Sequence, residues 1–317
     1  MAKKSRSKSA TSSASTAVGP RQPCPCGSGR RFKACHGSPG GESPYVVRTF
    51  EGLPAECDWV ALREFVPAGK APLALKADAY GGQAANRTFT VTSVLPGIAP
   101  AMVRSNGEIW LAMQVAHQSS DPSRDFAEAL RLALDGDPGS SVVMVTPPAA
   151  GPRLQDVVDP KSSFDVMVLD GFDYWFDDPP DADASVAATL ENLNSSIDPT
   201  VRLQSVEAAY WTSVGTKEHL RWVLPYDEEL LLTALARLHV AGADQLGNDS
   251  RLVGSFRAHG LLVPVWDLPV GTGASALEEP AAAFDRRLRH ALADRSPLTS
   301  EERAGRNGLA NRQITIR

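Results

Sequence analysis

Two patterns of apolar residues take turns along the chain. In residues 88–95, apolar side chains such as Phe89 and Val91 alternate with threonines, which is the period of a strand with one buried face. In residues 121–136, an Asp121-Pro122 start is followed by apolar residues at helical spacing up to a glycine. Because strands and helices are mixed in this way, the sequence predicts an α+β body.

The same patterns predict the other elements of this body. Strands are expected at 45–50, 73–76, 88–95, 102–104, 109–115, 141–145, 164–170, 172–176, 201–203, 208–214, 219–224, 252–256, 261–266 and 314–316. Helices are expected at 54–65, 121–136, 186–197, 227–242 and 281–293.

The order of these elements suggests a repeat. Residues 109–176 and 219–266 each run strand, Asp-capped helix, strand and strand, which predicts two related β-α-β-β halves. An acidic, proline-broken stretch at 177–184 separates the predicted halves, 45–176 and 185–317. The alternative is that this order recurs by chance, as it does in many α+β proteins.

Charge divides the chain more sharply than hydrophobicity does. Residues 1–37 hold eight basic side chains and no acidic one, whereas the rest carries 24 basic and 37 acidic side chains. A basic head on an acidic body favours contact of the head with a polyanion or an acidic surface. The alternative is that the basic residues only keep the N-terminus soluble.

The first 44 residues differ in composition from the body. Residues 1–20 are basic and small polar residues without periodicity, which predicts a disordered tail. Residues 38–44 contain two prolines and two glycines and are expected to form a linker. No apolar run is long enough for a membrane span and no signal peptide is evident, so we expect a cytoplasmic protein.

Between tail and linker, residues 21–37 gather three of the four cysteines. Cys24, Cys26, Cys35 and His36 supply the thiolates and imidazole that Zn²⁺ prefers in a tetrahedral site. The Gly27-Ser28-Gly29 turn lets the chain reverse and direct backbone N–H groups at the sulfur atoms.

A metal would also explain how so short a segment folds. It has one large apolar side chain, Phe32, so metal binding would supply its folding free energy, on the order of 10 kcal/mol for structural zinc peptides. With four ligand positions filled, the zinc is expected to be structural and not catalytic. The alternative is three free thiols made reactive by neighbouring basic residues.

This segment closely resembles the SEC-C motif, the small zinc module at the C-terminus of the translocase ATPase SecA. The resemblance rests on a Pro-Cys-Pro-Cys start, the Gly-Ser-Gly turn, the Phe32-Lys33 pair and the closing Cys-His-Gly. It implies a zinc site and docking onto a partner protein or the ribosome. The chain has no GxxxxGK[ST] sequence, so the motor of the translocase is not expected here.

Residues beside the ligands are candidates for partner binding. Arg30, Arg31 and Lys33 with Phe32 could form a small cationic surface with one stacking aromatic ring, as RNA-binding knuckles do. The alternative is that Phe32 packs over the zinc site while the basic side chains are solvated.

The body resembles an uncharacterised actinobacterial family in which a SEC-C motif precedes one domain. The stretches FEGLPAECDWVALREFVP, GPRLQDVVDP, RLVGSFRAHGLLVPVWDLP and NGLANRQITIR carry this resemblance, which implies no activity. The body has no GxSxG, HExxH or GxGxxG motif, and its histidines show no metal-ligand spacing.

Two features of the body are weaker candidates for a site. Cys57 lies between Glu56 and Asp58, whose charges would raise the pKa of the thiol, and is expected to be a buried packing residue. Arg257 and His259 alternate on one strand face beside Gly254 and Gly260, with Arg251 a strand-width away, and would line a cleft if the body has one; the alternative is a solvated strand face.

Three hypotheses follow from these patterns. The first is a non-catalytic adaptor that docks through its structural zinc knuckle. The second is an enzyme with an unrecognised cleft in the body, and the third is a ribosome- or RNA-associated binder that uses the basic zinc head.

Overall fold

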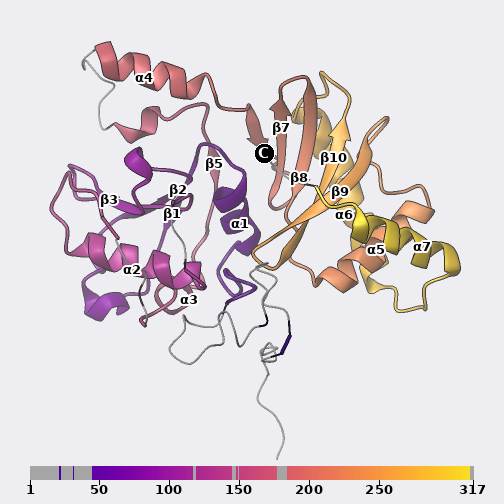
Figure 1. Ribbon diagram of the computed structural model, residues 1–317, viewed down its shortest axis with the longest axis horizontal. Helices are drawn as coiled ribbons and strands as arrows, with labels where there is room; N and C mark the ends of the chain where they lie inside the picture. Colours follow the sequence, from indigo (N-terminus) through magenta and orange to yellow (C-terminus); the bar gives the residue numbers. More distant parts are fainter. Residues whose placement is uncertain are drawn as a thin grey trace, which may run out of the picture.

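The computed structural model describes residues 21, 22, 31, 45–116, 119–144, 148, 150–176 and 184–314. Two five-stranded sheets, one in each half of the body, stand on either side of helix α1 (Glu56–Glu64), as Figure 1 shows. We call residues 45–176 the first half and residues 184–314 the second half. The α+β class predicted from the sequence is confirmed.

The first half contains a mixed sheet in the order β3-β4-β2-β1-β5. Strands β2 and β4 are parallel, and the other neighbours are antiparallel. Its strands are β1 (Gly69–Leu73), β2 (Phe89–Thr92), β3 (Ala101–Val103), β4 (Ile109–Ala112) and β5 (Met167–Val168). Its other helical segments are η2 (Ala79–Gly82), η3 (Pro96–Ile98), α2 (Pro122–Leu134), α3 (Leu154–Val157) and η4 (Asp173–Trp175).

The second half contains an antiparallel sheet in the order β6-β7-β8-β10-β9. Its strands are β6 (Thr200–Arg202), β7 (Ala209–Val214), β8 (Lys217–Trp222), β9 (Arg251–Ala258) and β10 (Leu261–Leu268). Its helices are α4 (Ala184–Asn194), α5 (Glu228–Val240), η5 (Ser275–Leu277), α6 (Glu278–Ala293) and α7 (Ser300–Asn311).

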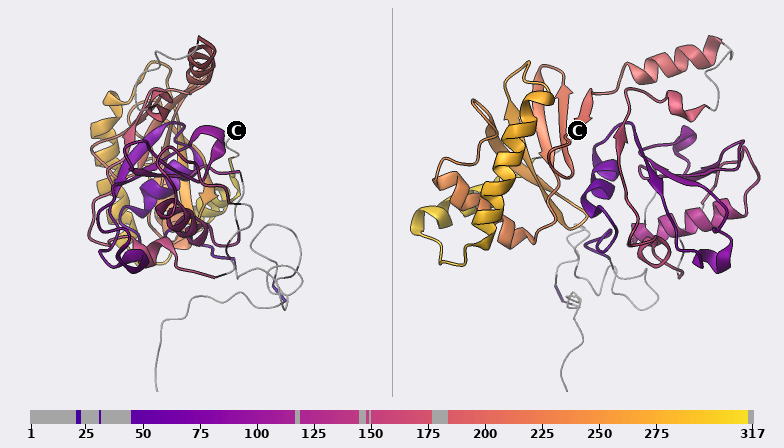
Figure 2. Two further views of the ribbon diagram at one scale, coloured as in Figure 1. Left: turned by 90° about the vertical axis from the view of Figure 1, so that its left-hand side faces the viewer. Right: turned by 180° about the vertical axis from the view of Figure 1, so that it is seen from behind.

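The second sheet is buried on both faces, and this joins the two halves. One face packs Trp222 and Trp266 against α5 and α6, which Figure 2 shows covering the sheet from behind. The opposite face contributes Tyr210 and Val263 to a core shared with α1 and the first sheet. The halves therefore form one folded body with a common core, and are not two domains on a string.

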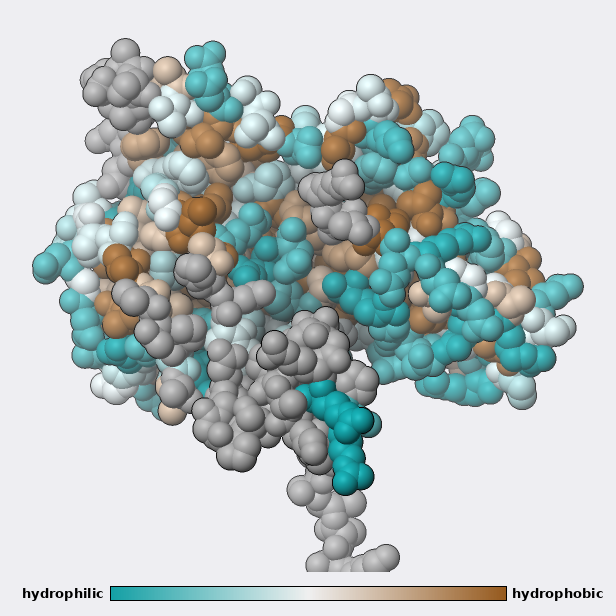
Figure 3. Space-filling model, in the orientation of Figure 1, coloured by the Kyte–Doolittle hydropathy of each residue, from teal (hydrophilic) through white to brown (hydrophobic). Residues whose placement is uncertain are grey.

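Helices α5 and α7 begin with side-chain caps, whereas Asp121, predicted to cap α2, forms no capping hydrogen bond. Asp227 accepts hydrogen bonds from the backbone N–H groups of Glu229 and Leu230 at the start of α5, as predicted. Helix α7 was not expected from the sequence. It starts with a capping box in which Thr299 and Glu302 bond each other's backbone N–H groups. In Figure 3, hydrophilic residues cover much of the end of the molecule where α5 and α7 lie.

Several predicted strands are absent or shorter. Residues 45–50 form no strand, because their contacts are made chiefly by side chains and single backbone groups. In the predicted strand 141–145, Ser141 makes only an isolated bridge, and residue 145 is outside the described residues. Residues 173–175 form the 3-10 helix η4, because Phe172 and Trp175 stack with ring centroids 4.7 Å apart.

The β-α-β-β order predicted for both halves is present only in the second. Residues 217–268 run β8, α5, β9 and β10, whereas residues 109–176 run β4, α2, α3, β5 and η4. The sheets also differ in direction, since the β2–β4 pair is parallel and the β8–β10 pair is antiparallel. The predicted β-α-β-β order is therefore wrong for the first half, and a duplication stays a prediction from the sequence.

The predicted basic tail, the linker at 38–44 and most of the acidic stretch at 177–184 lie outside the described residues. Residue 314 is described and forms no strand, although its N–H donates to the carbonyl of Ser255. Among the residues that the structure describes, no helix is long and apolar enough to cross a membrane.

The turn between β9 and β10 supplies a test of how the halves meet. Gly260 has a φ of +80°, and a Cβ built there would lie 2.8 Å from the Val47 carbonyl oxygen and 2.9 Å from the Arg48 Cα. Gly271 has a similar φ of +85° but open space around it. The G271A variant should lose about 1–2 kcal/mol of stability from backbone strain.

The G260A variant should lose about 1–3 kcal/mol more, because it also displaces the segment on which the first half begins. Urea unfolding of both variants measures the difference. Equal losses would show that the contact between Gly260 and residues 47–48 contributes nothing to stability.

Candidate functional site

The four predicted zinc ligands, Cys24, Cys26, Cys35 and His36, lie outside the described residues, as do Arg30, Phe32 and Lys33. Arg31 is described, and its side chain is exposed. The ligand assignment thus rests on the chemistry of the donor set, which suits Zn²⁺. Within the described part of the body, no group of three or more His, Cys, Asp and Glu residues could hold a metal ion.

The segment that follows the predicted linker is held by both halves. Arg48 forms a bidentate ion pair with Glu56, with both N–O distances at 2.7 Å. The backbone carbonyl of Thr49 accepts hydrogen bonds from Arg153 and Gln155 of the first half. The hydroxyl of Thr49 lies 2.9 Å from Nδ1 of His259, which belongs to the second half. Residues 45–53, α1 and the sheet face against them form what we call the junction.

A buried charge cluster fixes the junction. The carboxylate of Asp58 on α1 faces both Nε and a terminal nitrogen of Arg202 at 3.0 Å and accepts the Tyr210 hydroxyl at 2.5 Å. Burial and the Asp58 charge raise the pKa of Tyr210 well above its usual value. Burial alone would lower the pKa of Arg202, but the hydrogen bond and charge of Asp58 raise it overall. Tyr210 therefore stays neutral and Arg202 stays charged at neutral pH.

Sequence reasoning did not find this cluster. Arg202 and Tyr210 lie 144 and 152 residues from Asp58, so no local pattern connects them. The one available signal is Asp58 itself, because this charged residue lies directly before Trp59 among apolar residues of the predicted helix. A charge in such a position predicts a partner without identifying it.

Cys57 is buried, as predicted. Its pKa is raised, first by burial and then by the charges of Glu56 and Asp58. The thiol lies at the wall of a cavity of about 300 Å³ that Arg202, Tyr226 and Arg289 also line. Because a thiolate is needed for nucleophilic attack, the geometry gives Cys57 a packing role.

The structure does not gather Arg251, Arg257 and His259 into one cleft. Arg251 lies at the start of β9, while Arg257 near its end pairs with Glu228 on the surface. His259 lies at the junction, where Nε2 is 2.9 Å from the Glu64 carboxylate and the ring packs on Phe50. Each residue therefore serves a different contact, and in the described part of the body the three residues do not line one cleft.

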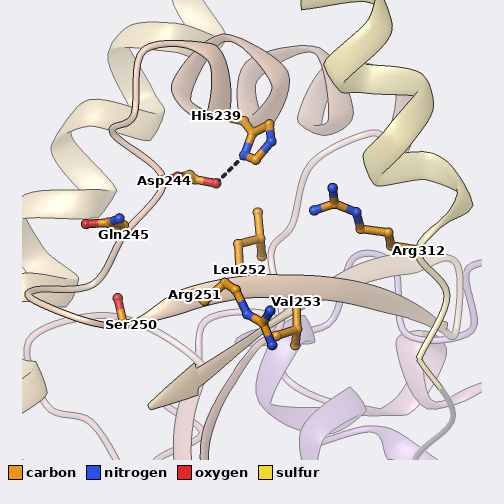
Figure 4. Close-up of a pocket in the computed structure, with 8 residues that line it drawn as sticks. All are labelled: His239, Asp244, Gln245, Ser250, Arg251, Leu252, Val253 and Arg312. Carbon is orange, nitrogen blue, oxygen red and sulfur yellow. Dashed lines mark hydrogen bonds and ion pairs between the residues drawn. The ribbon is translucent and has the colours of Figure 1, made fainter. Parts of the chain in front are cut away.

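The cavity that Arg251 does line lies at the edge of the second sheet. It has a volume of about 460 Å³ and lies between β9, the end of α5 and the residue after α7. Figure 4 shows the guanidinium of Arg312 pointing into it, opposite His239, whose Nδ1 is 2.6 Å from Asp244. Arg251 points away from this pair, toward Val253. With the histidine held by Asp244 and Arg251 directed elsewhere, the cavity lacks converging functional groups.

The Asp58 cluster should dominate the stability of the junction. Replacing Arg202 by methionine would leave the Asp58 carboxylate, which is only 3% exposed, without its cation. We therefore expect the free energy of unfolding to fall by about 3 kcal/mol. R257M is the matched control, since its partner Glu228 is 34% exposed and such surface pairs contribute about 1 kcal/mol or less.

Urea unfolding of both variants measures the two losses. Equal effects of R202M and R257M would mean that the buried cluster does not fix the junction.

The thiol of Cys57 should resist alkylation while the protein is folded. With its pKa raised, iodoacetamide at pH 7.5 should label Cys57 only after urea unfolding. Peptide mass spectrometry locates the label, and the cysteines of the head serve as the reactive reference after metal chelation. Rapid labelling of Cys57 in the native protein would contradict the packing role.

Comparison with known proteins gives two matches along the chain. The profile of the SEC-C motif matches residues 21–38, and that of a family of unknown function (DUF5926) matches residues 49–317. No curated protein and no solved structure matches the chain. The SEC-C match confirms the resemblance drawn from the cysteine spacing, and the longer match covers both halves. The chain therefore belongs to the DUF5926 family and carries a SEC-C motif ahead of the family's domain.

Proposed function

We propose that this protein is an adaptor whose SEC-C motif binds one structural Zn²⁺ and docks onto a partner, while the body provides a rigid support. The observation that carries the proposal is the SEC-C match at residues 21–38, which contains Cys24, Cys26, Cys35 and His36. Three thiolates and one imidazole complete a tetrahedral set without an open position, as in structural zinc sites.

Zinc would supply the folding free energy of the head, which has too few apolar side chains to form a core. The side chains between the ligands would contact the partner. Arg30, Arg31, Phe32 and Lys33 lie between the second and third ligands and would be presented to a partner when the ligands close around the metal. With these basic side chains, the head suits an acidic protein surface.

The junction supports this arrangement. Residues 45–53 are held by Arg153 and Gln155 of the first half and by His259 of the second half. The seven residues 38–44 can span at most about 25 Å. The head would therefore stay within that distance of a point that both halves fix.

RNA is the second candidate partner, because residues 1–37 carry eight basic side chains and no acidic one. Contacts with phosphate groups and with an acidic protein surface both weaken as the salt concentration rises. Ribonuclease separates the two partners, because it abolishes binding only if the partner is RNA.

Metal analysis tests the head directly. The purified protein should contain one zinc per chain, and C24S combined with C35S should lose it, as measured by inductively coupled plasma mass spectrometry. The C57S variant is the matched control, because Cys57 is buried in the body and should leave the zinc content unchanged. Retention of zinc by the double variant would contradict the ligand assignment.

The same variants test docking. Immobilised full-length protein should capture partners that C24S/C35S does not, while both proteins show the same thermal unfolding of the body. Treatment with ribonuclease then distinguishes a protein partner from RNA. Identical capture by both proteins would show that the head is not the docking element.

A further inference from the structure

A second cavity at the junction, of about 320 Å³, lies between the end of α1 and the second sheet. Its volume is at the lower end of the range of small-molecule sites, about 300–1,000 Å³. The residues that line it come from both halves: Glu64, Phe65, Pro67, Gln114, Asp198, Thr200, Thr212 and Arg221.

Arg221 differs from the other arginines at the junction. Arg48 and Arg202 each hold a carboxylate in a bidentate pair. The guanidinium of Arg221 lies over the ring of Phe65 at 5.7 Å from its centroid, and among the described residues it makes no hydrogen bond or ion pair. Burial lowers the pKa of Arg221, while the charge of Asp198 acts in the opposite direction. The cavity therefore contains a half-buried cation with unused donors, which suits an anionic group.

The cavity also contains acceptors with capacity left. Both hydrogens of the Gln114 amide are used, because Nε2 donates to the carbonyls of Leu62 and Val66, and this leaves Oε1 as an acceptor. Oε1 of Glu64 is 2.9 Å from His259, and its second oxygen makes no hydrogen bond among the described residues. Although burial raises the pKa of Glu64, the hydrogen bond and charge of His259 lower it overall, so the carboxylate stays ionised at neutral pH.

We propose that this cavity binds a zwitterion of amino-acid size, with the carboxylate of the ligand on Arg221 and its ammonium group on Glu64 and Gln114. A multiply charged anion such as phosphate fits less well, because Glu64 and Asp198 place two negative charges on the same cavity. An amine alone would leave Arg221 without a partner, and a carboxylate alone would leave the second oxygen of Glu64 without one. A ligand that carries both charges meets each requirement.

The roles of the surrounding residues follow from their contacts. The hydroxyl of Thr200 donates a hydrogen bond to the Asp198 carbonyl oxygen at 3.0 Å and lies 3.3 Å from the Thr212 hydroxyl. This wall of the cavity is therefore already ordered. His259 orients the Glu64 carboxylate, and Phe65 supports the Arg221 guanidinium. The site is thus preorganised by the junction, which lowers the cost of binding.

Binding is tested with the full-length protein. Each of the twenty common L-amino acids is added separately in a thermal-shift assay, and those that raise the melting temperature are titrated by calorimetry. For the tightest binder, the amine and the carboxylic acid with the same side chain are titrated as well. We expect saturable binding of at least one amino acid, weakened about tenfold or more when either charged group is missing.

Two variants locate the site. R221Q should weaken binding about tenfold or more, because it removes the cation that faces the carboxylate. R251Q is the matched control, since Arg251 lies on the same sheet, is 77% exposed and does not line this cavity, and its affinity should equal that of the native protein. If R221Q fails to fold, the comparison of amino acid, amine and acid on the native protein still tests whether binding requires both charged groups.

The proposal is overturned if no amino acid binds in the millimolar range, if R221Q binds as tightly as R251Q, or if inorganic phosphate binds as tightly as the best amino acid. These outcomes concern the body only. The docking proposal would stand or fall separately, on the zinc content and on the capture of partners by the head.

Discussion

Helix α1 is the element on which the body depends, because it is buried between two sheets. Trp59, Val60, Ala61 and Leu62 are consecutive and fully buried, so this helix has no solvent-facing side along its centre. A helix in that position can carry a charge only if a partner neutralises it. Asp58 meets that condition through Arg202 and Tyr210, both from the second half. The correct packing of the first half thus requires the second.

This requirement explains why the halves are not independent. The apolar core that includes Trp59 also includes Tyr210, Val263 and other residues of the second sheet. Because a cavity or an unpaired charge at α1 would be felt in both halves, their unfolding is expected to be cooperative.

Local signals were predictable from the sequence, and distant pairings were not. The Asp227 cap and the two strands on either side of Gly260 were predicted because their determinants lie within a few residues of one another. Strand 172–176 was wrong because its aromatic residues stack against each other and on Leu190 instead of pairing with a neighbouring strand. Helix α7 was missed although Thr299 and Glu302 have the spacing of a capping box, because its apolar stripe is thin and only Leu309 is buried.

The two candidate sites also differ in whether their residues are close together in the sequence. The donor set Cys24, Cys26, Cys35 and His36 could be proposed from spacing alone, since a metal site in a short loop is local in sequence. The cavity at Arg221 could not, because Glu64, Gln114 and Arg221 come from three separate parts of the chain. Its features depend on how α1 meets the second sheet, which is a property of the completed fold.

The head and the body obtain their stability from different sources. The body has extensive buried apolar surface, whereas the head has one large apolar side chain and would depend on its metal. What connects them is residues 45–53, held by the Arg48–Glu56 pair and by hydrogen bonds of Thr49 to both halves. Such a connection can fix the point at which the predicted linker joins the body. Under the docking proposal, the body would position the head, and recognition would take place at the head itself or in the cavity between the end of α1 and the second sheet.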